Sequence, residues 1–208
     1  YSPMKKLLIR STITILSFMS LQVFAHTKFG NVTMEELHMT NYPQDTTASA
    51  VILSKKGSTY FTYDDRLGFQ RKHTIEMRLK ILKPDGLDWC TNEISYRDFG
   101  LDRRERIEGL SGTTYNLESG KIVKTKLSKD LISDESVDDK YKIRKFTMPA
   151  AKAGSVIEFK YNLVSDFYYI IPDYWFQTKI PIADVSYEIT IPEYFRFNMN
   201  TLGYQSIN

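Results

Sequence analysis

The segment from Phe69 to Leu82 constrains the fold most, because polar side chains alternate with mainly apolar ones along it. One face carries Phe69, His73, Ile75, Met77, Leu79 and Ile81, and the other carries Gln70, Lys72, Thr74, Glu76, Arg78 and Lys80. A period of two is typical of a β-strand with one face buried and the other in water. We therefore predict a long strand in an antiparallel sheet with one solvated face.

This strand is predicted to form a long hairpin with the residues that follow it. Lys83-Pro84-Asp85-Gly86 is typical of a turn, because proline presets φ and glycine accepts the left-handed conformation. The segment from Trp89 to Tyr96 would then return antiparallel, with Cys90 beside Leu79. In that register His73 lies near Tyr96, six residues or roughly 20 Å along the strand from Cys90.

The rest of the chain predicts further short strands and one helix. The expected strands span 48–53, 59–63, 113–117, 121–126, 140–148, 155–163, 175–180 and 185–191. Lys55-Lys56-Gly57 and Glu118-Ser119-Gly120 would each join two of them as hairpin turns. Residues 128–139 are expected to form a loop or a short exposed helix. Thr33 and Glu36 have the spacing of a capping box at the start of a short helix. These elements favour an all-β fold, an antiparallel β-sandwich with one short N-terminal helix.

The first 25 residues have the features of a signal peptide. Lys5, Lys6 and Arg10 precede a mostly apolar run, 11–23, and Val23-Phe24-Ala25 offers a cleavage site. An uncleaved membrane anchor is the alternative, but the run falls short of the ~20 apolar residues that a spanning helix needs. We expect residues 1–25, with three residues upstream of Met4, to be removed. Residues 26–208 would then form the β-sandwich domain, truncated at its C-terminal end, in the periplasm or cell envelope of a bacterium.

The charge of the chain argues against nucleic acid as a partner, and its cysteine content excludes an intrachain disulfide. The chain has 28 Lys and Arg against 25 Asp and Glu, and the three basic residues of the signal peptide account for the whole excess. A neutral mature domain argues against nucleic acid as a partner, because phosphate binding normally needs a basic face. With Cys90 as the single cysteine, no intrachain disulfide can form.

No residue set in the sequence predicts catalysis, a metal site or a cofactor. Cys90 lies in a strand-like context remote from His73, and a nucleophile needs its base within ~3 Å. The three histidines, His26, His38 and His73, are scattered, whereas metal sites need clustered ligands. Adjacent carboxylates at 64–65 and 138–139 and the mixed-charge run 103–106 are interpreted as solvated loops. An enzyme complete within these residues is therefore disfavoured.

The stretch from 167 to 177 is dense in aromatic residues and is the one candidate binding or interface site. The side chains concerned are Tyr168, Tyr169, Tyr174, Trp175 and Phe176. Aromatic rings on a β-sandwich can stack on sugars, so the stretch could serve a glycan- or peptide-binding module. Packing in the core or against another domain is the alternative, since each large ring buries 150–250 Å² when it is used that way.

Several ordered motifs resemble one known family. They are 148–161 (Met-Pro-Ala-Ala-Lys-Ala-Gly-Ser-Val-Ile-Glu-Phe-Lys-Tyr), 172–177 (Pro-Asp-Tyr-Trp-Phe-Gln), Ile180-Pro181, 191–194, 29–32 with 35–37, and 115–121. Together they resemble domain of unknown function 3857, an N-terminal β-sandwich of exported bacterial proteins. The resemblance implies a non-catalytic accessory domain, followed in a longer protein by a transglutaminase-like Cys-His-Asp domain. The downstream domain would be the partner of this one, and none of its catalytic residues matches a position here.

Overall fold

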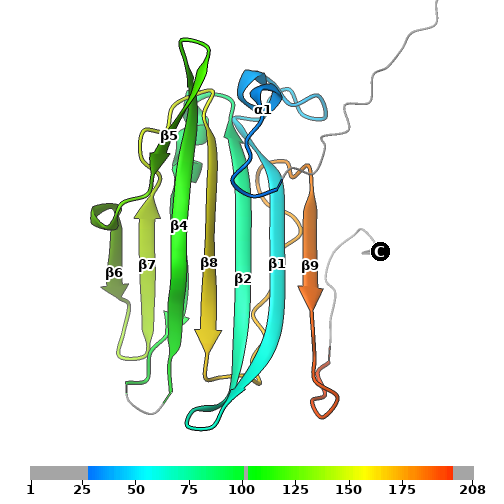
Figure 1. The fold of residues 1–208 in the computed structure, drawn as a ribbon, viewed down its shortest axis with the longest axis vertical. Helices are drawn as coiled ribbons and strands as arrows, with labels where there is room; N and C mark the ends of the chain where they lie inside the picture. The colour runs from blue at the N-terminus through cyan, green and yellow to red at the C-terminus, as the bar shows by residue number, and fades with distance from the viewer. Residues whose placement is uncertain (1–27, 101–102, 199–208) are drawn as a thin grey trace, which may run out of the picture.

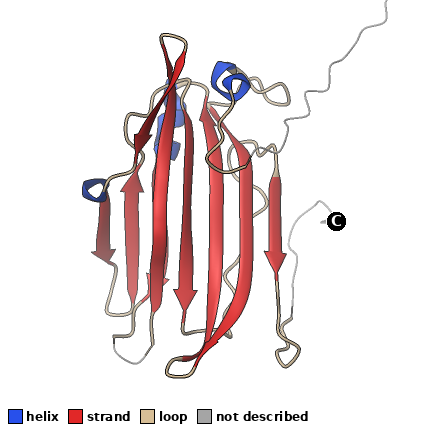
Figure 2. Cartoon of the chain, in the orientation of Figure 1, coloured by secondary structure: helices blue, strands red, loops and turns tan. Residues whose placement is uncertain are grey.

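The computed structural model describes residues 28–100 and 103–198, so the predicted signal peptide lies outside the described residues. The strands are β1 (Ala50–Asp64), β2 (Gly68–Ile81), β3 (Thr91–Arg97), β4 (Glu105–Glu118), β5 (Lys121–Lys126), β6 (Ile132–Ser136), β7 (Tyr141–Thr147), β8 (Val156–Ser165) and β9 (Val185–Ile189). They are accompanied by helix α1 (Met34–His38) and two 3-10 helices, η1 (Pro84–Cys90) and η2 (Lys129–Leu131). Figure 2 shows how far strands dominate the molecule.

The strands form two sheets, which confirms the predicted all-β sandwich. The larger sheet has the order β5-β4-β8-β2-β1-β9, and the smaller has the order β3-β7-β6 (Figure 1). One pair departs from the antiparallel expectation, because β9 lies parallel to β1. A parallel neighbour needs a long crossover, and residues 166–184 supply it by passing behind β2 and β1 (Figure 1).

Strand β1 is continuous through the predicted turn at Lys55-Lys56-Gly57, so that prediction is wrong. β1 pairs with β2 from Ala50 opposite Ile81 to Asp64 opposite Gly68. The turn lies after β1 instead, where Oδ1 of Asp64 accepts hydrogen bonds from the backbone N–H of residues 66 and 67. This side chain closes the turn locally, which residues 55–57 have no means to do.

The predicted hairpin between β2 and β3 is also wrong. Residues 84–90 form η1, which carries the chain to the smaller sheet, and there β3 pairs antiparallel with β7. Strand β2 has no free edge for β3, because β1 occupies one side of it and β8 the other. The predicted turn residues therefore begin a crossing between sheets.

Most of the shorter strands are confirmed, and two segments differ. Strands β4, β5, β7, β8 and β9 match expected ones, although β4 begins well before residue 113. Residues 175–180, expected as a strand, are irregular. Residues 128–139, expected as a loop or helix, contain η2 and the edge strand β6. β6 is almost entirely solvent-exposed, so it lacks the apolar alternation that would reveal a strand.

The main core lies between the two sheets. Ile52, Leu79 and Ile157 from the larger sheet are buried with Ile94 and Phe146 from the smaller one. The Phe146 ring meets the edge of the Phe159 ring with 5.2 Å between their centroids. This packing confirms that the apolar face of β2 points inward.

The polar face of β2 is only partly solvated, contrary to expectation. Helix α1 and the residues before it lie over one end of this face (Figure 1), and they bury Arg78 and Lys80. Nζ of Lys80 donates to the carbonyl oxygens of Leu37, at 2.7 Å, and Gly154, at 2.6 Å. Because these charged ends are hydrogen-bonded, they can lie under the helix.

Helix α1 begins with the predicted capping box. The backbone N–H of Glu36 donates to Oγ1 of Thr33 at 3.2 Å, and the backbone N–H of Thr33 donates to Oε2 of Glu36 at 2.7 Å. Within the described ranges, no helix has the length and apolar character needed to cross a membrane.

Candidate functional site: a cleft between the sheets

A cleft of about 470 Å³ opens between the two sheets, and we call it the inter-sheet cleft. Its floor is the inward face of β2 and β8. One wall is β3, through residues 92–95, and the opposite wall is residues 172–175 of the crossover. Its volume lies within the range of sites that bind small molecules or peptide side chains.

The floor of the cleft is mainly apolar, with polar groups at the ends of a few side chains. His73 and Ile75 of β2 lie beside Leu163 and Tyr161 of β8 in the sheet register. Nδ1 of His73 lies 2.7 Å from Oγ1 of Thr59, so the imidazole is held by a neighbouring strand. Burial, helped by the charges of other residues, lowers the pKa of His73 to about 4. Burial also raises the pKa of Tyr161 to about 12, so both groups are neutral at pH 7.

Lys55 brings a buried ammonium to the cleft. The residue is only 9% exposed, and its Nζ donates to the carbonyl oxygen of Trp175 at 2.6 Å. The same nitrogen lies 4.7 Å from the centroid of the Tyr174 ring, in a cation–π contact. In the part of the chain that the structure describes, no carboxylate forms an ion pair with it. Burial accordingly lowers the pKa of Lys55.

The predicted aromatic site is divided between two places. Tyr168 stacks on Phe195, with ring centroids 5.4 Å apart, and also contacts Phe69 and Tyr169 at the far end of the sheet. Tyr169 is 50% exposed. Tyr168 thus packs against a residue that follows β9, and neither tyrosine lines the inter-sheet cleft.

The other three predicted residues lie at the cleft or beside it. Tyr174 stacks on Tyr187 with 4.6 Å between ring centroids, and Phe176 meets the edge of the Tyr174 ring. The hydroxyl of Tyr174 lies within hydrogen-bonding distance of two backbone carbonyls, those of Lys55 and Ser186. Trp175 is 67% exposed at the rim. The five residues therefore do not form one flat platform.

Gly57 allows Tyr174 to lie against the sheet. A Cβ added at this position would come within 2.4 Å of Cε2 of Tyr174 and 2.8 Å of Cδ2 of Tyr187. A glycine inside a strand pattern often marks such a close approach. This signal could have revealed that 55–57 belongs to a strand that another segment covers.

Replacing Gly57 with alanine should displace residues 172–176 from the sheet. We expect a loss of about 1–3 kcal/mol in the free energy of unfolding, since overpacking costs that much. Urea unfolding monitored by circular dichroism measures it. Ser58→Ala, one residue along on the opposite face, serves as the control and should change stability by less than about 0.5 kcal/mol. Equal stability of the Gly57→Ala protein and the wild type would show that Tyr174 is not held against the strand.

Cys90 is buried at the end of η1, as a structural thiol was predicted to be. It packs in the main core with Phe146 and Met148, and its carbonyl oxygen accepts a hydrogen bond from the backbone N–H of Met148. Burial raises the pKa of Cys90 to about 11. Nδ1 of His73 lies 2.7 Å from Oγ1 of Thr59.

The Cys90 thiol should resist alkylation in the folded protein. At pH 8 its thiolate fraction is lower than that of an ordinary cysteine by a factor of about 100, because the pKa is raised and only the thiolate reacts. We expect iodoacetamide to label the native protein at least that much more slowly than the urea-unfolded protein, as measured by mass spectrometry. Comparable rates in the two states would contradict the burial of this thiol.

The adjacent carboxylates lie in solvated turns, as they were interpreted. Asp64 and Asp138 accept hydrogen bonds from nearby backbone N–H groups, and Asp65 and Asp139 are exposed. For Glu105 of the mixed-charge run 103–106, the loop interpretation is wrong. Glu105 begins β4, is 4% exposed and pairs with the buried Arg71 at 2.9 Å, because a buried carboxylate needs such a partner. Arg106 pairs with Asp166 at 3.3 Å. Among the described residues no cluster of three metal-binding side chains occurs, and His26 lies outside them.

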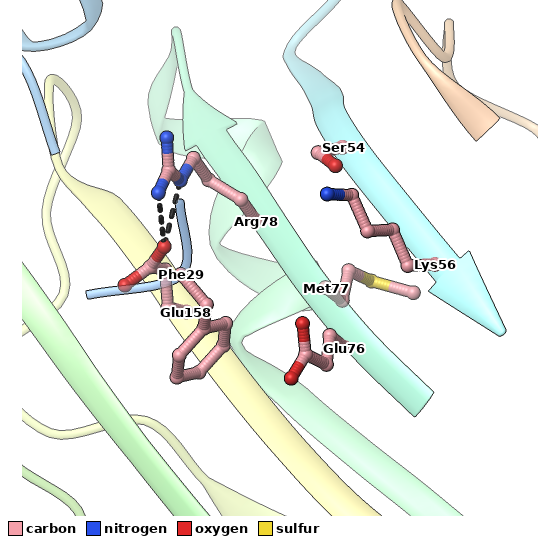
Figure 3. Close-up of a pocket in the computed structure, with 7 residues that line it drawn as sticks. All are labelled: Phe29, Ser54, Lys56, Glu76, Met77, Arg78 and Glu158. Carbon is pink, nitrogen blue, oxygen red and sulfur yellow. Dashed lines mark hydrogen bonds and ion pairs between the residues drawn. The ribbon is translucent and has the colours of Figure 1, made fainter. Parts of the chain in front are cut away.

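A second, much smaller pocket lies on the outer face of the larger sheet. Figure 3 shows Phe29 beside the paired Arg78 and Glu158, with Ser54 and Lys56 across the strands. Its volume of about 20 Å³ holds little more than one water molecule. The inter-sheet cleft is therefore the better candidate site.

Sequence reasoning found residues 174 and 175 but missed Lys55, His73 and β3. Lys55 was interpreted as part of a turn, and β3 was placed beside β2. Both errors come from pairings that are distant in sequence, because the cleft exists only where two sheets face each other.

These features define a β-sandwich domain with a cleft between its sheets. The chain belongs to the family described as "Domain of Unknown Function with solved-structure structure (DUF3857)", whose model matches residues 69–206. The match begins within β2, so α1 and β1 precede it. No curated protein matches the chain.

Among solved structures, the chain is similar to a crystal structure from Parabacteroides distasonis that is described as a "putative protease". The two are 16% identical, with a TM-score of 0.43 over 56% of this chain. The chain spans 23% of the length of that protein.

Proposed function

We propose that this chain is a non-catalytic accessory domain of an exported bacterial protein in the periplasm or cell envelope. Its role is to position polypeptide for a transglutaminase-like domain, a peptidase or amide-processing enzyme, that lies beyond Asn208 in the same protein. The observation that carries the proposal is the inter-sheet cleft, which has a mainly apolar floor of two strands and an aromatic wall. Such a surface suits binding, and the family match adds the expectation of a longer protein.

The state of Cys90 and His73 supports a role without catalysis. A nucleophilic thiol needs a lowered pKa and a base in contact with it. Cys90 has a raised pKa and packs in the core, while the pKa of His73 is lowered and its Nδ1 contacts Thr59. The thiol of Cys90 therefore lacks the lowered pKa that a cysteine hydrolase requires, and the imidazole of His73 contacts a threonine hydroxyl in place of a thiol.

The alternative, a glycan-binding module built on residues 167–177, fits the geometry less well. Stacking on a sugar needs an exposed ring face, and Tyr174 instead places its face on Tyr187. Tyr169 and Trp175 are the most exposed rings of the stretch, and they belong to separate clusters. The aromatic residues are used mainly for packing, which favours the accessory role.

Two experiments on the full-length protein test the proposal. Amide hydrolysis should persist within about twofold in a Cys90→Ala variant, and it should vanish when the cysteine of the downstream domain is replaced. Circular dichroism would confirm that Cys90→Ala is folded. Calorimetric titration with peptidoglycan fragments and soluble polysaccharides should give no binding heat. Loss of hydrolysis in a folded Cys90→Ala protein, or saturable binding of a polysaccharide, would overturn the proposal.

A further inference from the structure

In the part of the chain that the structure describes, one edge of β3 has no partner strand, and this edge faces the inter-sheet cleft. In the order β3-β7-β6, β3 pairs only with β7. Residues 92–95 line the cleft, and the opposite wall, 172–175, is irregular. The layer above β2 and β8 therefore has a gap between β3 and the crossover.

The hydrogen bonds at the two ends of the β3–β7 pairing show in which direction the main-chain groups of β3 point. The backbone N–H of Met148 donates to the carbonyl of Cys90, and the N–H of Asp98 donates to the carbonyl of Lys140. Even-numbered residues of β3 thus bond to β7, and odd-numbered ones direct N–H and C=O away from it. Arg97 confirms the pattern, since its N–H donates to Oε2 of Glu105 at 2.9 Å.

Two residues of this edge lie in the cleft with their main-chain groups unused. Among the described residues, nothing accepts from or donates to the backbone of Glu93 or Ser95 on the side away from β7. An unpaired row of N–H and C=O groups is a template for another extended chain.

We propose that an extended segment of a substrate polypeptide binds in the inter-sheet cleft as a further strand of the smaller sheet, antiparallel or parallel to β3. This inference rests on the proposed function and names the class of ligand. An added strand would lie about 4.8 Å from β3, and every second side chain would point to the floor. There it would contact Ile75, Tyr161 and Leu163, so apolar residues are favoured at those positions.

Lys55 adds a requirement for negative charge. Its ammonium is buried and contacts the cleft, and among residues 28–100 and 103–198 its partners are a carbonyl and a ring face. A buried cation is stabilised most by a carboxylate. An inward-pointing Asp or Glu near the Trp175 wall would supply one. The inward-facing positions of the preferred segment therefore carry apolar residues and at least one acidic residue.

A phage-displayed library of linear octapeptides, selected on the immobilised full-length protein, identifies such segments. We expect enriched peptides to have apolar residues at alternate positions and an acidic residue in the same register. The best peptide, labelled with fluorescein, would then be titrated by fluorescence anisotropy. Enrichment of no peptide, or of peptides without this pattern, would overturn the proposal while leaving the hydrolysis tests of the accessory role unaffected.

Variants of the protein test the binding mode. Ser95→Pro removes an N–H from the free edge of β3 and should weaken binding about tenfold or more. Ser136→Pro is the matched control, because it lies in β6 at the other edge of the same sheet, and it should leave the Kd within about twofold. Lys55→Met should weaken the acidic peptide about tenfold but leave its Glu→Gln counterpart unchanged. Equal effects of the two proline variants would contradict strand addition.

Hydrogen exchange on the free protein tests whether this chain itself or a second copy of it fills the cleft in place of a substrate segment. The Glu93 and Ser95 amides should exchange rapidly without peptide and become protected when it binds. Protection in the free protein would show that this chain or a second copy already fills the cleft, and light scattering would distinguish the two. Either result would overturn the proposal of a substrate segment.

Discussion

Replacing Arg78 with methionine is expected to lower the free energy of unfolding by about 3–5 kcal/mol, the cost of removing one partner of a buried ion pair. Arg78 is 4% exposed, and its guanidinium pairs with Glu158 at 2.5 Å and with Glu36 at 2.7 Å. Methionine fills similar space but removes the guanidinium that pairs with two buried carboxylates, those of Glu36 and Glu158. Urea unfolding monitored by circular dichroism measures the loss.

The same guanidinium holds the N-terminal segment on the outer face of the sheet. It donates to the carbonyl oxygen of Lys28, and Glu158 accepts hydrogen bonds from the N–H of Gly30 and the hydroxyl of Tyr115. We therefore expect amides of residues 28–39 to lose protection from exchange in Arg78→Met before the rest of the sheet does.

Lys152→Met is the matched control for Arg78→Met. Lys152 pairs with Glu118 at 3.0 Å, and both side chains are about half exposed. A surface pair of this kind contributes about 0–1 kcal/mol. Similar losses in the two variants, or an unchanged stability of Arg78→Met, would show that the burial of the pair is not what stabilises the segment.

Stability should fall by roughly 3 kcal/mol between pH 6.5 and pH 4 through His73 alone. Burial lowers the pKa of this imidazole to about 4 from an ordinary 6.5. Between these pH values the unfolded chain binds the proton and the folded one does not, so stability rises with pH and is lost as pH falls. The size follows from 1.36 kcal/mol for each pH unit between the two pKa values. Unfolding curves in urea at half-unit pH steps measure it.

A His73→Gln variant isolates this contribution from the protonation of carboxylates, which occurs in both proteins. The difference in unfolding free energy between wild type and variant should change with pH in this window and be constant above pH 7.5. His38→Gln, at an exposed position of α1, should retain the pH dependence of the wild type. A pH-independent difference between wild type and His73→Gln would mean that the imidazole is accessible to protons.

Features that depend on neighbours in sequence were predictable. The alternation along β2, the capping box at Thr33 and the hairpin of β4 and β5 each involve residues a few positions apart. Their physical causes, the side-chain period of a strand and the hydrogen bonds of a helix start, act locally. The all-β class followed from these elements.

The pairing of strands depended on competition for edges. Pro84 and Gly86 favour a turn, and a turn does form, but both edges of β2 are taken by β1 and β8. Local turn chemistry cannot show which strand pairs with β2, because the pairing with β8 joins residues 76 or more positions apart. Among the described strands, the same competition leaves β3 paired with β7 on one edge only.

The pattern of neighbouring residues in the sequence therefore determines that the chain forms strands, where most of them lie and how the first helix begins. Its chemistry at the cleft depends on contacts between distant segments: Lys55 meets Trp175 across 120 positions, and Thr59 meets Tyr187 across 128. Burial by such contacts lowers the pKa values of Lys55 and His73. A lysine beside a glycine looks like a turn in sequence, and it becomes a buried cation only because an aromatic segment packs over it.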